Sequence, residues 1–267
     1  MTALTIEQAV LRPGVVARSP GFADEWVADA ERLAGDYGPP PAAGAVFARP
    51  LGPQHAAVVR AADRYGSACF HVLILPLPLY RALNDPFAVA DRFPPAWDAR
   101  GDLPALEWAG GPLPPRRVAD VQDALRTGDS VTLLGAAQAL VDGGPVVFER
   151  PAPDPDLVRR LWLLLPASSR AELWPAEFAP ANALGFDLLV TPKAGDDCAG
   201  YLSEQQAGDY PEGRYELNLQ IAAEAGDQAA LDALFARRSG RQTIRLALVL
   251  IAVALVLAAA VRLFGGH

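Results

Sequence analysis

The longest apolar stretch of the chain lies near its C-terminal end. Residues 246–261, LALVLIAVALVLAAAV, contain no charged residue, proline or glycine. At 1.5 Å per residue a helix over them is about 24 Å long, and neighbouring apolar residues extend it toward the roughly 30 Å core of a bilayer. A helix buried in a protein core would instead show a polar face. The pattern therefore predicts a single transmembrane helix at residues 244–264.

Apolar runs between turn signals predict β-strands in the first half of the chain. A short strand is expected at residues 15–17, and residues 45–49 and 56–61 flank a Gly-Pro-Gln turn that is typical of a hairpin. Residues 69–75, CFHVLIL, are apolar except for His71, which is typical of a central strand covered on both faces. Helical spacing predicts a helix at residues 26–34.

Helix signals occur at residues 85–86 and dominate the second half of the chain. Asp85-Pro86 and Asp154-Pro155 each resemble a capping aspartate followed by proline at the first helical position. Further helices are expected at residues 118–126, 131–141, 156–165, 215–225 and 228–237, and strands at residues 146–148, 171–178 and 186–190. The polar residues 195–208 are expected to be mobile.

Strands and helices alternate without a regular βαβ rhythm, which indicates an α+β fold with a mixed sheet. The part before the apolar stretch is long enough for one large domain or two small ones. The chain changes character at the Pro-Pro pair of residues 114–115. This change favours an α+β subdomain at residues 1–115 and a more helical one at residues 116–240.

Arginines are gathered on one side of the predicted membrane helix. The N-terminal side carries Arg237, Arg238, Arg241 and Arg245, against Arg262 on the other side. Positive charge stays in the cytoplasm, so the preceding domain is expected to face the cytoplasm. Together with the abundance of alanine and arginine, this predicts a single-pass protein of a bacterial inner membrane. Its lipid partner is contacted through residues 244–264.

Composition narrows the classes of function. A formal net charge of −8 argues against a general nucleic-acid surface. Lys193 is the only lysine and lies outside any phosphate-binding motif, and no dinucleotide-binding motif is found, so no cofactor is expected. The opening residues show no apolar run of signal-peptide length, so export of the domain is not expected, and Cys69 and Cys198 are expected to be free thiols.

Two interpretations of His71 follow from its neighbours. Cys69 lies two residues before it, but two such side chains on one strand are about 6–7 Å apart, and four paired zinc ligands are not found. The structural interpretation is a hydrogen-bonded core histidine. The alternative is a membrane-anchored hydrolase or transferase whose site combines His71 and Cys69 with Asp85 or Asp187. A carboxylate or thiol within hydrogen-bonding reach of His71 would favour the enzyme.

One family resemblance is carried by short motifs. VARSPGF at residues 16–22, and FHVL at residues 70–73 followed by DPF at residues 85–87, resemble the N-terminal region of bacterial GTPase-associated proteins of predicted conflict systems. The similarity covers residues 11–92 and extends loosely to residue 192. The family usually has an aromatic-rich strand before the Ser-Pro-Gly turn, whereas TALTIEQAVL precedes it here.

The resemblance implies a non-enzymatic adaptor or scaffold whose protein partner is a nucleotide-dependent switch. It supplies no catalytic residue. The candidate binding residues on its motifs are Ser19, Gly21, Phe22, His71 and Asp85. The leading hypothesis is therefore a membrane-tethered cytoplasmic interaction module, with the membrane-anchored hydrolase or transferase as the alternative.

Overall fold

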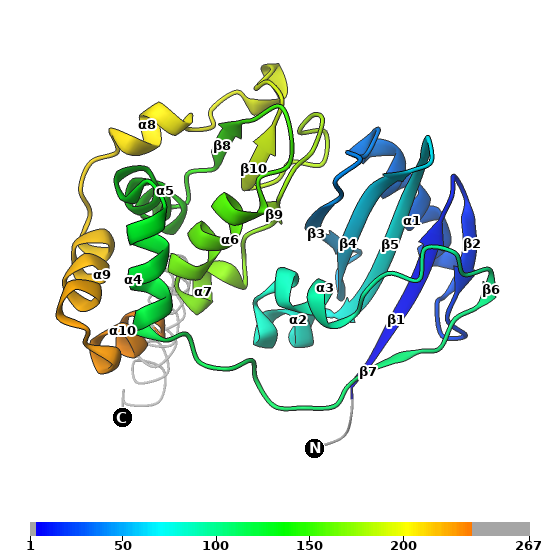
Figure 1. The fold of residues 1–267 in the computed structure, drawn as a ribbon. Helices are drawn as coiled ribbons and strands as arrows, with labels where there is room; N and C mark the ends of the chain where they lie inside the picture. The colour runs from blue at the N-terminus through cyan, green and yellow to red at the C-terminus, as the bar shows by residue number, and fades with distance from the viewer. Residues whose placement is uncertain (1–3, 237–267) are drawn as a thin grey trace, which may run out of the picture.

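The computed structural model describes residues 4–236. These residues form an α+β fold around one ten-stranded sheet, with strand order β6-β2-β1-β5-β4-β3-β9-β10-β8 and β7 paired to β1 (Figure 1). The sheet contains both parallel and antiparallel pairs. The predicted fold class, α+β with a mixed sheet, is confirmed.

The N-terminal strands pair antiparallel. They are β1 (Leu4–Leu11), β2 (Val15–Arg18), β3 (Ala45–Leu51), β4 (His55–Arg64) and β5 (Ser67–Pro76). The predicted hairpin is β3–β4, and the predicted central strand is β5, which lies between β1 and β4. Strand β1 was not predicted, because its polar residues Glu7 and Gln8 interrupt the apolar pattern.

Two short strands flank β1 and β2. Strand β6 (Gly101–Asp102) pairs with β2, and β7 (Leu106–Trp108) pairs with β1. The side chains of Leu103 and Trp108 are buried. They anchor the segment that carries β6 and β7 to the sheet.

The remaining strands run parallel to one another. They are β8 (Val146–Glu149), β9 (Pro175–Ala176) and β10 (Leu188–Thr191). The strand predicted at residues 171–178 is wrong in extent. The backbone N–H groups of Glu172 and Leu173 both donate to the Ser169 carbonyl, so a helical turn continues into this segment. Pro175 then lacks an N–H group to extend a ladder.

Strands from the two predicted subdomains share the sheet. Strand β9 pairs with β3 through Phe47 and Ala176, and we call this contact the β3/β9 junction. The Glu177 backbone N–H donates to the Val46 carbonyl beside it, at 2.9 Å. The subdomain boundary near residue 115, which falls between β7 and α4, remains a prediction.

Helices cover both faces of the sheet. Helix α1 (Asp24–Tyr37) packs on one face, burying Ala30, Leu33 and Tyr37. Helices α2 (Leu77–Leu83) and α3 (Pro86–Arg92) pack on the opposite face. The predicted cap of α3 is confirmed, since the Asp85 carboxylate accepts from the Ala88 N–H at 3.0 Å.

The second half of the chain adds a helical layer at one end of the sheet (Figure 1). It consists of α4 (Val118–Thr127), α5 (Ser130–Asp142), α6 (Pro155–Leu164), α7 (Ala167–Arg170), α8 (Glu204–Gly208), α9 (Arg214–Ala225) and α10 (Gln228–Phe235). Helix α5 is buried from Thr132 to Leu140. It is the centre of this layer, and it packs against α6, α8 and α9.

Residues 195–208, which the sequence predicts to be mobile, contain helical elements. The segment contains the 3-10 helix Asp196–Cys198 and helix α8, which starts with a capping box between Ser203 and Gln206. A Cβ atom at Gly135 would lie 1.9 Å from the Ala207 carbonyl oxygen, so glycine lets α8 approach α5 closely. The polar composition of α8 gave no sign of this contact, because Ala207 is the buried residue of that helix.

Within residues 4–236 no helix is long and apolar enough to cross a membrane. The helix predicted at residues 244–264 lies outside the described residues. So do the flanking arginines Arg237, Arg238, Arg241, Arg245 and Arg262.

Candidate functional site

The predicted turn at residues 19–22 is fixed against strand β1. The Ser19 hydroxyl accepts a hydrogen bond from the Gln8 backbone N–H at 2.9 Å and donates to the Glu7 carboxylate. A Cβ atom at Gly21 would lie 2.3 Å from Glu7 Oε1, so glycine permits the close approach. Phe22 is buried beneath α1. The turn thus holds the entry of α1 against the sheet, and its binding role remains a prediction.

His71 lies in the centre of the sheet with 1 % of its surface exposed. Its Nε2 atom is 2.9 Å from Gln8 Oε1, and Gln8 Nε2 donates to the Pro104 carbonyl at 2.7 Å. Because the amide nitrogen of Gln8 is engaged by that carbonyl, its oxygen accepts from the imidazole, which donates through Nε2. The partner of His71 is thus an amide. The predicted position in a buried central strand is confirmed.

Burial, together with the nearby charge of Arg60, lowers the pKa of His71 to about 4. Desolvation disfavours the imidazolium, and the neutral ring still donates a hydrogen bond to Gln8 Oε1. His71 is consequently neutral at pH 7.

Replacing His71 by glutamine is expected to flatten the acid dependence of stability. The pKa of the imidazole is near 6.5 in the unfolded chain and about 4 in the folded one. Above pH 6.5 the imidazole is neutral in both the folded and the unfolded chain, and its contribution to the free energy of unfolding is fully present. As the pH falls toward 4, the imidazole binds a proton in the unfolded chain but not in the folded one. The free energy of unfolding therefore falls by about 3 kcal/mol. The introduced glutamine would still donate to Gln8 without titrating.

Urea denaturation of wild-type protein and His71→Gln at pH 7 and pH 4.5 measures the difference. His71→Ala serves as a comparison, because it also lacks the titration but leaves a void and an unpaired Gln8. Equal losses of unfolding free energy in wild type and His71→Gln between the two pH values would contradict the assignment.

The other residues of the enzyme alternative have partners of their own. Asp85 accepts from the Ala88 N–H and from Arg170, so it links α3 to α7. Asp187 accepts from the Trp174 backbone N–H at 2.8 Å. The Cys69 thiol lies 3.5 Å from the Ser67 carbonyl oxygen. In the described residues, no three His, Cys, Asp or Glu side chains are grouped to hold a metal ion.

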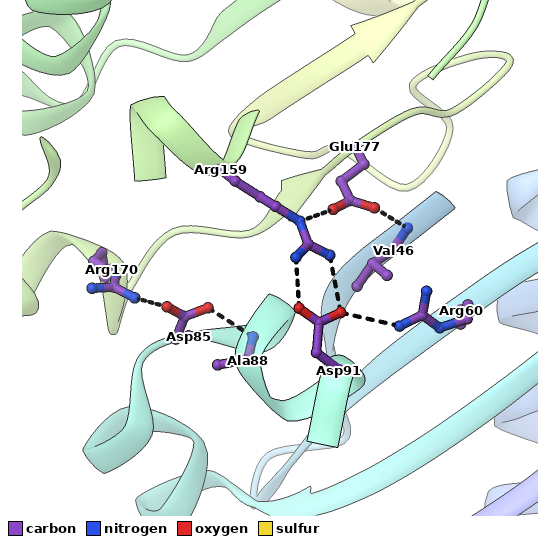
Figure 2. A network of polar contacts seen from close by, with 8 residues as sticks. All are labelled: Val46, Arg60, Asp85, Ala88, Asp91, Arg159, Arg170 and Glu177. Carbon is purple, nitrogen blue, oxygen red and sulfur yellow. Dashed lines mark hydrogen bonds and ion pairs between the residues drawn. The ribbon is translucent and has the colours of Figure 1, made fainter. Parts of the chain in front are cut away.

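An ion-pair network crosses the β3/β9 junction (Figure 2). Arg159 of α6 donates to Glu177 at 2.7 Å and to Asp91 of α3 at 2.6 Å. Glu177 also accepts from the Val46 N–H of β3 at 2.8 Å. Burial raises the pKa of Glu177, while Arg159 and the Val46 N–H oppose that shift. The network connects the sheet, α3 and α6.

A partly buried arginine, Arg116, holds the last described helix in place. Arg116 donates to the Leu163 carbonyl at 2.7 Å, and its guanidinium lies 3.5 Å from the centre of the Phe235 ring. Burial lowers the pKa of Arg116 to about 9, and the charge of Arg170 acts in the same direction. Gln228 donates to the Arg116 carbonyl at 3.0 Å. Both ends of α10 are therefore attached to the domain.

The outer face of the helical layer carries exposed apolar side chains. Five large hydrophobic residues are exposed in the described part of the chain, and three of them, Val131, Leu217 and Ile221, lie on α5 and α9. Val131 is 62 % exposed, Leu217 43 % and Ile221 56 %. We call these three residues the α9 surface. Leu217 and Ile221 lie one helical turn apart on α9, and Val131 lies at the start of α5, a helix that packs against α9.

Two grooves flank α9. The α9/α10 groove has a volume of about 540 Å³ and is lined by Asn218, Ile221, Ala222, Ala230, Ala233 and Leu234, with Arg214 at one end. A second groove of about 300 Å³ lies between α9 and helices α4 and α5, lined by residues including Leu125, Leu134 and Ala223. Volumes of about 300–1,000 Å³ are typical of binding pockets.

Sequence reasoning predicted helix α9 but missed its second apolar stripe. Tyr215, Leu219 and Ala222 follow helical spacing and are buried. Leu217 and Ile221 are also four residues apart, on a different face. Placing the residues on a helical wheel would have revealed the second stripe, because one buried face of a helix cannot contain both the Leu219 stripe and the pair Leu217 and Ile221.

No protein-family model, curated protein or solved structure matches this chain. The resemblance to GTPase-associated proteins therefore remains a prediction.

Proposed function

We propose that this chain is a membrane-tethered interaction module of the bacterial cytoplasm. Residues 244–264 anchor it in the inner membrane, and the folded domain presents the α9 surface to a protein partner. The apolar run at residues 246–261 and the arginines before it support the tether and its orientation.

The observation that carries the proposal is the α9 surface beside the α9/α10 groove. Leu217 and Ile221 are apolar, exposed and one helical turn apart. A groove whose lining includes Ala222, Ala230 and Ala233 accepts the apolar face of a helix, a recurring mode of peptide recognition. The family resemblance favours a GTPase-type switch as the partner that supplies this helix.

Replacing Leu217 and Ile221 together by glutamine is expected to reduce capture of the partner by about tenfold or more, because central apolar anchors carry most of the energy of an interface. Both side chains are exposed, so the melting temperature should change little. The measurement is a pull-down from native membranes with full-length tagged protein, with and without a non-hydrolysable GTP analogue, quantified by mass spectrometry.

Tyr65→Asn is the matched control. Tyr65 is 95 % exposed and lies on the turn between β4 and β5, away from α9. Its backbone φ of 58° is one that asparagine tolerates. Capture that is equal for wild type and the double variant would remove the α9 surface from the proposal. Capture that ignores the nucleotide would exclude a GTPase-type switch as the partner.

A further inference from the structure

We propose that the α9/α10 groove holds the chain's own apolar segment, residues 246–261, before membrane insertion, and that insertion vacates the groove for the partner. This inference rests on the proposed function, since it concerns the same groove and the same tether.

The groove suits an apolar helix. Its lining includes Ala222, Ala230 and Ala233, whose small side chains let a helix backbone approach closely. Residues 246–261 carry no charge that would be buried there. From Arg214 to Ala222 the groove follows about 12 Å of helix α9, so it covers roughly two turns of an incoming helix.

The chain leaves the described domain beside this groove. Helices α9 and α10 are joined by a short turn at residues 226–227, and the groove between them is lined both by Arg214, at the start of α9, and by Leu234, near the end of α10. Phe235 is held there by Arg116. Residues 237–245 then connect to the apolar segment, and such a connector reaches up to about 30 Å. The segment can therefore turn back into the groove.

Tethering favours this occupant over a separate molecule. A short flexible connector gives an effective concentration on the order of millimolar, which a free partner helix in the cytoplasm does not reach. The segment is also apolar on all sides, so water disfavours leaving it exposed. A bilayer offers cover for its whole length, whereas the groove covers only part of it. Transfer to the membrane is therefore the favoured final state.

The arrangement makes membrane insertion and partner binding mutually dependent. Occupation of the groove by the chain's own segment excludes a partner helix from the same alanines. Insertion releases the groove, so a partner binds where the bilayer is. Coupling of this kind is reciprocal: a partner in the groove also favours insertion.

Cysteine crosslinking of the full-length chain tests the inference. Ala230→Cys, on the exposed side of α10, is combined in turn with cysteine at Val253, Ala254, Leu255 or Val256, which together sample every face of one helical turn. The protein is purified in detergent and transferred either to buffer or to vesicles of phosphatidylethanolamine and phosphatidylglycerol. A short bismaleimide crosslinker is then added.

At least one pair is expected to crosslink within a single chain in buffer, and the crosslinked fraction in vesicles should be at least about fivefold lower. Ala28→Cys, exposed on α1 on the other side of the sheet, replaces Ala230→Cys as the control and should give no crosslink with the same four positions.

The inference is overturned if no pair crosslinks in buffer, if crosslinks form only between chains, or if vesicles leave the fraction unchanged. Carbonate-resistant association with the vesicles is scored in the same samples. A chain that fails to associate contradicts the tether itself, whereas a chain that associates but never crosslinks in buffer contradicts only the occupation of the groove.

Discussion

Deletion of residues 243–267 is expected to move the protein from the membrane fraction to the soluble fraction. These residues contain the whole apolar run, and the fold at residues 4–236 is built from its own sheet and helices. Ultracentrifugation after a carbonate wash measures the shift, and circular dichroism with a thermal melt reports on the fold. A truncated protein that stays with the membrane would contradict the prediction, as would loss of its cooperative melt.

Leu255→Arg should give part of the same shift without shortening the chain. An arginine in the middle of a membrane helix costs about 2.5–3.5 kcal/mol on insertion scales, while Leu255→Ala keeps the helix apolar and serves as the control.

In inverted vesicles, added protease should digest the folded domain and spare a tag placed after His267. Protection of the domain would reverse the proposed orientation.

Glu177→Ala is expected to lower the free energy of unfolding by about 2–3 kcal/mol, because it removes a charge-assisted hydrogen bond and leaves a buried N–H group without its acceptor. The Glu177 side chain is 5 % exposed, and its two oxygens accept from Arg159 and from the Val46 N–H. Truncation leaves that buried N–H without its acceptor at the β3/β9 junction, where only Phe47 and Ala176 pair across the two strands. Urea denaturation with two spectroscopic probes measures the loss.

Asp91→Ala provides the contrast within the same network. The Asp91 side chain is 50 % exposed, so water replaces much of its pairing with Arg159, and a loss of about 1 kcal/mol or less is expected. Glu177→Gln should fall between the two, since an amide oxygen still accepts from Val46 but carries no charge. Equal losses for Glu177→Ala and Asp91→Ala would show that burial does not govern the network.

The sequence alone determined the elements whose causes are local. Asp85 and Asp154 are capping aspartates followed by proline, and both caps form as predicted, because a cap needs only the N–H groups of the next three residues. The β3–β4 hairpin and the apolar strand β5 also follow from local patterns, and so does the class α+β with a mixed sheet. The apolar run at residues 246–261 predicts the membrane tether from composition and length.

Tertiary structure decided what depends on residues far apart in the chain. Strand β1 carries polar residues and is a strand because β5, β2 and β7 pair with it. The network around Glu177 joins residues from β3, α3 and α6, and no spacing of residues in the sequence predicts it. Gly135 allows helix α8 to pack closely on α5 in a segment that polar composition predicted to be mobile. The exposure of Leu217 and Ile221 depends on which face of α9 the other helices cover, because burial is a property of the packed fold.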